Sequence, residues 1–285
     1  MSVGRLNDRG VSGAAFRTTN VPSFQILGVR VHVVEMADTM KHLRAWIEDR
    51  QSSARFVAVT AMHGVAAARR DAAFRRVLNS ADLVVADGTP LVWVARIKGH
   101  RFRRRVSGCD LLDNFCRDSG GAYRHFFYGG TPGAAERLAN TLRDRFGIVV
   151  AGTYTPPFRP MTNAEESELA TIVERASPDV LWVGLSTPKQ ENWMYQHRHK
   201  VKVPLMLGVG AAFDLNSGNV ERAPVWMRDH GLEWLFRLAA EPRRLWKRYL
   251  ITIPHALWFV GLELMGLSKV PLAESPGVQS EHTIL

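Results

Sequence analysis

A carboxylate follows an apolar run in residues 82–90, which read DLVVADGTP. Leu83 to Ala86 have the composition of a buried strand, and Gly88 lets the backbone approach a ligand directly after Asp87. A carboxylate in that position can act as a general base and take a proton from a substrate hydroxyl. Asp is also a common N-cap residue, so Asp87 can instead cap the helix predicted over 89–99, and the two roles can overlap.

A glycine-rich loop is the second feature that could do chemistry. Gly129, Gly130 and Gly133 lie in YGGTPG, between an apolar run and a helical pattern. The free amides and the positive dipole end of a helix there favour a phosphate group. The loop matches neither G-x-G-x-x-G nor a Walker A loop, and GVGAAFD (208–214), which contains Gly210, lacks the third glycine of the dinucleotide fingerprint. These spacings allow a phosphate ligand and disfavour a nicotinamide enzyme.

The overall charge indicates an anionic partner. Among 285 residues, 37 Lys and Arg outnumber 27 Asp and Glu, for a formal charge of +10. Nucleic acid, anionic lipid and phosphorylated substrates all suit such a chain, but the basic residues match no nucleic-acid-binding motif. The basic segment RIKGHRFRRR (96–105) resembles a solvated loop for most of its length, and we keep Arg105 and Asp110 from this region as candidate binding residues.

A second basic segment, EWLFRLAAEPRRLWKRYL, has helical periodicity. Arg237, Arg244 and Arg248 recur at spacings of seven and four, which puts them on one helix face beside an apolar stripe. Pro242 can break this helix or begin a second one.

The stretch YLITIPHALWFVGL then runs 14 residues without a charge, short of the ~20 apolar residues that a spanning helix needs. It predicts a helix lying in the interface of an anionic membrane, with an ordinary core helix as the alternative.

Metal sites and disulfides are not predicted. No H-E-x-x-H or paired C-x-x-C occurs, and His197 and His199 in QHRHK are read as a solvated helix face. Cys109 and Cys116, seven residues apart on one predicted helix, are expected to pack as small hydrophobic residues in a reducing compartment.

The elements that position these residues alternate along the chain. Apolar runs such as RFVAVT, DLVVA and DVLWVGL are separated by helical patterns, which predicts an α/β fold with a Rossmann-like, mainly parallel sheet and helices on both faces. Ligands of such sheets bind outside the carboxyl ends of the strands, where Asp87 lies. We expect disordered tails at 1–22 and 271–285, an α/β domain at 23–240 and an amphipathic or apolar appendage at 241–270.

Eight motifs in order, between about residues 55 and 250, resemble the WecG/TagA/CpsF glycosyltransferases (glycosyltransferase family 26). They are VTAMHG, LNSADLVVADGTPLVW, RVSGCDL, FFYGGTPG, PDVLWVGLSTPKQENW, GVGAAFDLNSG, ERAPVWMRDHGLEWLFRL and EPRRLWKRY. The resemblance implies an inverting, metal-independent transfer of a sugar, N-acetylmannosamine in several members, from a UDP donor to a polyprenyl-diphosphate-linked saccharide. It also implies no cofactor, and a peripheral location on the cytoplasmic face of the cell membrane, reached through the C-terminal helices.

The resemblance also implies roles for single residues. Asp87 corresponds to the family's general base, and Thr60 to the threonine that ends the preceding strand and faces the same pocket. Met62 stands where the family often has Asn, followed by His63, so donor preference can differ from that of the best-known members. The remaining substrate-binding positions implied in this way are Gly129 and Gly130 for the diphosphate, Lys189 and Gln190 in P-K-Q-E, Gly210 and Asp214 in GVGAAFD, with Asp214 near the nucleoside, and Arg237, Arg244 and Arg248 for the leaving UDP or the lipid diphosphate.

Two alternatives stay open at this stage. The first is a donor that carries a uronic acid, such as UDP-glucuronate in exopolysaccharide synthesis, because the additional arginines would suit its carboxylate. The second is a membrane-associated module that binds UDP or polyprenyl phosphate without catalysing a reaction.

Overall fold

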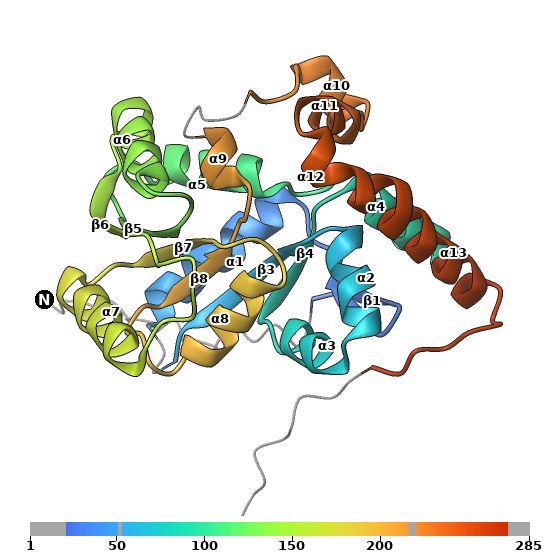
Figure 1. The fold of residues 1–285 in the computed structure, drawn as a ribbon, viewed down its shortest axis with the longest axis horizontal. Coiled ribbons are helices and arrows are strands. Elements are labelled where there is room, and N and C mark those ends of the chain that lie inside the picture. The colour runs from blue at the N-terminus through green and yellow to red at the C-terminus, as the bar shows by residue number, and fades with distance from the viewer. Residues whose placement is uncertain (1–20, 51–52, 217–220, 273–285) are drawn as a thin grey trace, which may run out of the picture.

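The computed structural model describes residues 21–50, 53–216 and 221–272. Residues 1–20 and 273–285, which hold nearly all of the two predicted tails, lie outside these ranges. Within them the chain forms an eight-stranded sheet with helices on both faces (Figure 1). The predicted α/β fold with a mainly parallel sheet is therefore confirmed.

The strands are short, and those at the centre of the sheet are buried on both faces, as their continuous apolar runs predict. In β3, Phe56 and Ala58 belong to one core cluster and Val57 and Val59 to the other, since successive strand side chains point to opposite faces. The strand order is β1-β2-β4-β3-β8-β7-β5-β6, and every neighbouring pair except β1 and β2 is parallel. The strands are β1 (Ser23–Ile26), β2 (Val29–His32), β3 (Arg55–Thr60), β4 (Leu83–Ala86), β5 (Arg124–Gly129), β6 (Val149–Tyr154), β7 (Val180–Gly184) and β8 (Leu205–Gly208).

Two groups of helices cover the two faces of the sheet. One core cluster lies under α2 (Met62–Arg70), α3 (Ala72–Asn79), α4 (Thr89–Ile97), α7 (Asn163–Ala176) and α8 (Lys189–His197). The other lies under α1 (Met36–Asp49), α5 (Gly108–Ser119), α6 (Ala134–Phe146) and α9 (Ala212–Asn216). This double covering leaves the edge at which the parallel strands end as the place where loops can gather around a ligand.

The apolar run QILGVRVHVV, near the start of the described residues, contains the turn of a hairpin. Leu27 and Gly28 both have positive φ, 48° and 81°, and they join β1 to β2 as a two-residue turn. Such turns match the right-handed twist of the strands. Leu27 is fully buried, so the turn adds no polar residue to the sequence and the apolar run continues through it.

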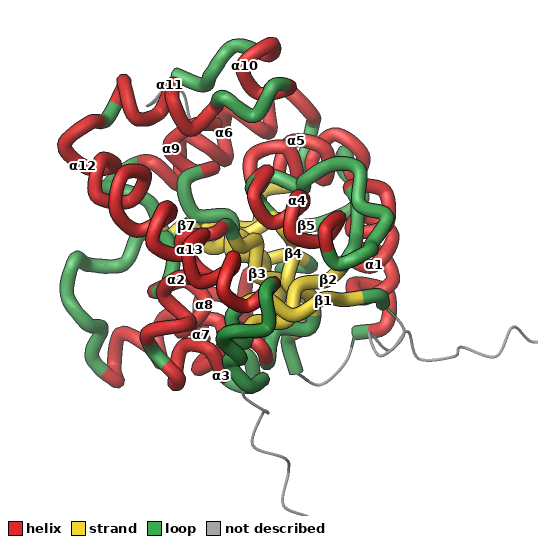
Figure 2. Tube along the Cα trace, turned by 90° about the vertical axis from the view of Figure 1, so that its right-hand side faces the viewer, coloured by secondary structure: helices red, strands yellow, loops and turns green. Residues whose placement is uncertain are grey.

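The C-terminal helices, α10 (Val225–Asp229), α11 (Glu233–Ala240), α12 (Pro242–Lys247), the π-helical turn η2 (Arg248–Thr252) and α13 (Ile253–Leu264), lie along one side of the domain (Figures 1 and 2). Pro242 begins α12, so the second of the two predicted outcomes for this proline is confirmed. Within the described ranges, no helix has the length and hydropathy needed to cross a bilayer.

Polar contacts fix α13 to the core. The Glu263 carboxylate accepts hydrogen bonds from the Lys98 ammonium at 2.7 Å and from the Leu27 backbone amide at 2.7 Å. The guanidinium of Arg69 on α2 lies 3.2 Å from the centre of the Phe259 ring, and Ala256 and Val260 are buried in the core. This end of the chain is thus part of the folded domain and not a loose extension.

Candidate active site

A cavity of about 540 Å³ lies at the carboxyl edge of the sheet, within the usual size range of a small-molecule site. Residues that follow β3, β4 and β8 form its floor, and the C-terminal helices form its opposite wall. The predicted residues that line it are Asp87, Arg105, Gln190, Gly210, Arg237, Arg244 and Arg248.

Asp87 lies on this floor and does not cap the neighbouring helix. Its backbone amide donates to the Thr60 carbonyl at 2.7 Å, and the N-cap of α4 is Gly88, whose φ of 133° favours glycine. The Asp87 side chain is 32% exposed, and it lines the cavity. Burial raises the pKa of Asp87, and the nearby Arg105 guanidinium partly offsets that rise.

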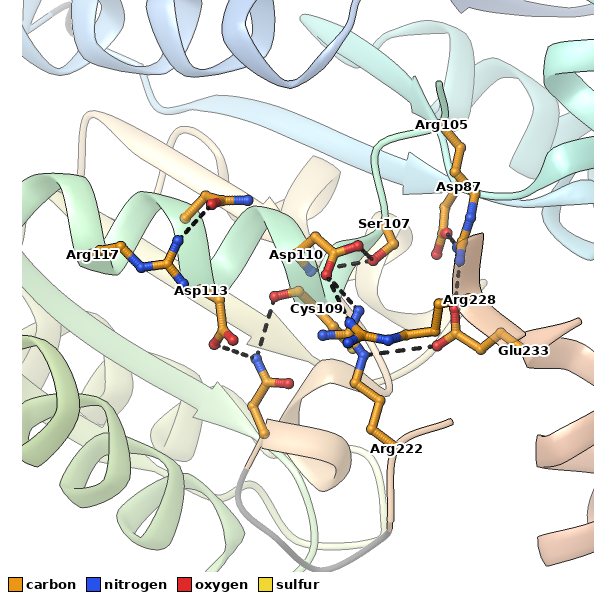
Figure 3. Close-up of polar contacts among 12 residues, drawn as sticks. Asp87, Arg105, Ser107, Cys109, Asp110, Asp113, Arg117, Arg222, Arg228 and Glu233 are labelled. Atoms are coloured by element: carbon orange, nitrogen blue, oxygen red, sulfur yellow. Dashed lines mark hydrogen bonds and ion pairs between the residues drawn. The ribbon is translucent and has the colours of Figure 1, made fainter. Parts of the chain in front are cut away.

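A chain of ion pairs joins Asp87 to the C-terminal helices (Figure 3). Arg105 donates to Asp87 Oδ1 at 3.0 Å and to Glu233 Oε2 at 2.5 Å. Glu233 Oε1 lies 4.0 Å from Arg222 Nε. Arg222 in turn binds the Asp110 carboxylate at 2.6 Å, and Arg228 lies 3.6 Å from the same carboxylate oxygen. Three carboxylates and three guanidinium groups therefore alternate across the junction between the core and the C-terminal helices.

Arg237, Arg244 and Arg248 bring further positive charge to the same cavity. Burial, and then the charges of Arg237 and Arg244, lower the pKa of Arg248. Burial and the charges of Arg248 and Arg237 lower the pKa of His63 to about 3, so His63 is neutral at physiological pH. Arg244 donates to Glu241 at 2.6 Å, which offsets part of this charge. The cluster has the electrostatic character of an anion site.

Other predicted binding residues lie beside the cavity and do not line it. Thr60 is fully buried, and its hydroxyl oxygen has no described hydrogen-bond partner. Lys189 is exposed and Asp214 is half-buried. Asp110 faces Arg222 and Arg228 across the ion-pair chain. Their predicted contacts with substrate stay predictions.

Gln190 and Met62 line the cavity from buried positions, each 2% exposed. The Gln190 amide nitrogen donates to Glu191 Oε1 at 3.0 Å, which fixes the orientation of the amide. Met62 begins α2, so an apolar thioether occupies the place where the family often has Asn.

Gly129 and Gly130 have a packing reason to be glycine. Their φ values are 119° and 77°, and a Cβ at Gly129 would lie 2.7 Å from the Gly184 carbonyl oxygen. A Cβ at Gly130 would lie 2.9 Å from Ala134 Cβ. Both stand at the end of β5, with β3, β8 and β7 between β5 and the strand that carries Asp87. They do not line the cavity that the described residues form, and a diphosphate role for them stays a prediction.

Glu233 and Arg222 were not predicted from the sequence. An acidic residue in the first turn of a helix is common, and a single Arg in ERAPVW lies in a loop, so neither position stands out. Only the fold shows that both side chains face residues of the core. The buried thiols of Cys109 and Cys116 are not joined to each other, and they pack in the core as expected.

The two histidines of QHRHK differ from each other. His199 is exposed as predicted, but the prediction for His197 was wrong. His197 is 2% exposed, stacks on Trp193 with ring centres 4.4 Å apart, and donates from Nδ1 to the Trp193 carbonyl at 2.8 Å. Among the described residues, no three His, Cys, Asp or Glu side chains gather in an arrangement that could hold a metal ion.

The fold and the cavity define a doubly wound α/β protein whose site pairs a carboxylate with a cluster of arginines, an arrangement suited to group transfer from a phosphorylated donor. The family model described as the glycosyl transferase WecG/TagA/CpsF family matches residues 24–269. The chain therefore belongs to this family of glycosyltransferases.

Curated relatives agree with this assignment. An N-acetylglucosaminyldiphosphoundecaprenol N-acetyl-beta-D-mannosaminyltransferase of Bacillus spizizenii is 31% identical over 222 residues, which cover 77% of this chain and 83% of the relative. A Bacillus subtilis protein of the same name is 29% identical over 67% of this chain and 73% of its own length. One from Staphylococcus aureus strain MRSA252 is 24% identical over 81% and 88%.

Proposed function

We propose that the chain is an inverting hexosyltransferase that moves a sugar of the N-acetylmannosamine type from a UDP donor to a polyprenyl-diphosphate-linked saccharide, without a metal ion. Family membership supports sugar transfer, and the names of the relatives support the acceptor and the transferred group. One observation carries the proposal. Asp87 and three arginines of the C-terminal helices line the same cavity.

The reaction exchanges one bond at the anomeric carbon for another. The acceptor hydroxyl oxygen attacks this carbon while its proton passes to the Asp87 carboxylate. The bond to the leaving oxygen breaks, and its electron pair stays on the diphosphate of UDP. Attack from the face opposite the leaving group inverts the anomeric configuration. The transition state therefore needs a base beside the acceptor and cationic groups beside the diphosphate.

The charges around the cavity meet the second requirement. Among the described residues that line the cavity, four guanidinium groups accompany two carboxylates, which leaves a surplus of two positive charges. An uncompensated charge in a partly buried site is costly, so a diphosphate that neutralises the surplus should bind favourably. The guanidinium groups are those of Arg105, Arg237, Arg244 and Arg248, and the carboxylates are those of Asp87 and Glu233.

We further propose that the C-terminal helices dock on the cytoplasmic face of the cell membrane, where the lipid-linked acceptor is found. Leu250, Ile251 and Trp258 are 61%, 51% and 67% exposed, which is unusual for apolar side chains in one short segment. Arg243 and Lys247 are exposed on the adjoining helix α12 and can contact anionic head groups. Ile253, Pro254 and Leu257 of the same segment line the cavity, so a lipid-linked acceptor in the membrane would lie next to the site.

Replacing the base should abolish turnover while nucleotide binding persists. Asp87→Asn keeps the shape of the side chain and removes its basicity, so the rate should fall about 10² to 10⁴-fold. The measurement is UDP release from UDP-N-acetylmannosamine with a short-chain polyprenyl-diphosphate N-acetylglucosamine, beside UDP affinity by calorimetry. Asp118→Asn, which removes a carboxylate paired with Arg44 outside the cavity, is the control and should keep normal activity. Wild-type turnover in Asp87→Asn would refute the base, and a wild-type chain that releases no UDP would favour the non-catalytic module.

Removing the three arginines should impair chemistry itself and not only membrane attachment. The triple variant Arg237→Ala, Arg244→Ala, Arg248→Ala should lose at least about 10²-fold in rate on a water-soluble acceptor analogue, because cationic groups stabilise the leaving diphosphate. UDP affinity should fall in parallel. Arg117→Ala, Arg143→Ala, Arg159→Ala removes the same charge from the core surface and should behave like the wild type. Full activity of the first variant on the soluble analogue would show that its arginines act on lipid alone.

Exposed apolar residues of the C-terminal helices should determine membrane binding. The variant Leu250→Gln, Ile251→Gln, Trp258→Gln should bind anionic vesicles about 10²-fold more weakly, given the apolar area that these side chains can bury. Co-sedimentation with vesicles of phosphatidylglycerol measures this binding. Phe158→Gln removes an apolar side chain that is 87% exposed elsewhere on the core, and it should sediment like the wild type. Equal sedimentation of the triple variant and the wild type would rule out docking through these helices.

A further inference from the structure

Arg105 stands between two carboxylates that come from different parts of the chain (Figure 3). Its Nη1 donates to Asp87 Oδ1 on the core at 3.0 Å, and its Nη2 donates to Glu233 Oε2 on α11 at 2.5 Å. The side chains of Arg105 and Glu233 are only 20% and 14% exposed. A pair this well shielded from water is stronger than a surface ion pair, and its geometry is correspondingly restrictive.

Attachment of the C-terminal helices to the core does not by itself explain the position of Glu233. Glu263 already ties α13 to the core through Lys98, and its side chain is 13% exposed, much like that of Glu233. Glu263 contacts neither Asp87 nor Arg105 among the described contacts. Glu233 differs because its ion pair ends on the guanidinium that also holds the proposed base.

Arg105 binds two carboxylates, and as a result one oxygen of Asp87 has no hydrogen-bond donor among the described residues. A guanidinium that faces one carboxylate alone tends to bind both of its oxygens with two parallel N–H groups. Here Glu233 takes one of those N–H groups, and Arg105 binds Asp87 through Oδ1. Among the described residues, no donor contacts Asp87 Oδ2. This second oxygen can therefore accept the proton of the acceptor hydroxyl.

We propose that Glu233 is a positioning residue for the transfer reaction: it holds Arg105 in a geometry that leaves one oxygen of Asp87 free, and it does so only while α11 is docked on the core. The inference rests on the proposed function, since it assigns Glu233 to the reaction in which Asp87 is the base. When the C-terminal helices dock on the core, Glu233 therefore reaches Arg105, and Asp87 keeps one oxygen free to accept a proton.

The charged and titratable groups that interact with Asp87 come from the loop before α5, from α5 itself and from the C-terminal helices. They are Arg105 from the loop before α5, Cys109 from α5, Glu233 and Arg237 from α11, and Tyr249 from η2. Burial raises the pKa of the Cys109 thiol to about 12 and also raises that of Tyr249, so both are neutral near pH 7. Of these groups, Glu233 alone adds negative charge, and it raises the pKa of Asp87.

Replacing Glu233 with a neutral residue should lower the pKa of Asp87 and so make it a weaker base. In Glu233→Gln the negative charge is lost and Arg105 can turn fully to Asp87, so the pKa of Asp87 should fall. The base works only when deprotonated, and activity is lost as pH falls through its pKa. The acidic limb of the kcat/KM profile should therefore move to lower pH, while the rate on its plateau drops about tenfold because a weaker base is a poorer catalyst.

Comparison of Glu233→Gln with two further variants tests this role of Glu233. Glu233→Asp keeps the charge with a shorter reach, so it should restore much of the plateau rate and bring the acidic limb back toward the wild-type position. Glu263→Gln breaks the matched ion pair on α13 and should leave the position of the limb unchanged. If Glu263→Gln moves the limb as Glu233→Gln does, or if Glu233→Gln leaves it in place, the proposal is overturned.

A readout without turnover separates this inference from the proposed function. The carboxyl carbon of Asp87 can be titrated by NMR in protein labelled with ¹³C-aspartate, with Asp87→Asn used to assign the signal. A lower Asp87 pKa in Glu233→Gln than in the wild type supports the coupling even if no donor sugar reacts. An unchanged Asp87 titration refutes the coupling even if the enzyme proves to be the proposed transferase.

Discussion

A surplus of positive charge gathers at the carboxyl edge of the sheet, and the core and the C-terminal helices hold it there together. The core supplies Asp87 and Arg105, and the C-terminal helices supply Glu233 together with Arg237, Arg244 and Arg248. Neither part forms the site alone, because the core forms the floor of the cavity and the C-terminal helices form its opposite wall. An ion pair shielded from water is costly to leave half-formed, which favours a docked arrangement of the two parts.

The parallel sheet explains why these groups can meet. Right-handed connections bring the ends of β3, β4 and β8 to one edge, and strands that are buried on both faces hold this edge rigid. The C-terminal helices then cross that edge and place apolar side chains outward beside the arginines. A site formed in this way faces a phosphorylated sugar on one side and, in the proposed function, a lipid-linked acceptor on the other.

Much of this arrangement could be predicted from the sequence. The alternation of apolar runs and helical patterns predicted the sheet. The position of Asp87 after such a run placed it at the cavity, and the spacing of Arg237, Arg244 and Arg248 placed these three side chains on one face. Some features could not be predicted, each for its own physical reason. The hairpin was not predicted because its turn, Leu27 and Gly28, contains no polar residue. The burial of His197 against Trp193 was not predicted because the neighbours of His197 in the sequence are polar. Glu233 looked like an ordinary residue at a helix start, because its partner Arg105 lies 128 residues away in the sequence.

In the proposed function, one cavity closed by the C-terminal helices holds the nucleotide. Hydrogen–deuterium exchange of the full-length wild-type chain with and without UDP tests it most directly, since amides near bound ligand become protected. UDP should protect both the loop after β4, residues 87–90, and the C-terminal helices, residues 233–252. Protection confined to the glycine turn at 129–133, with the C-terminal helices exchanging as before, would contradict the account.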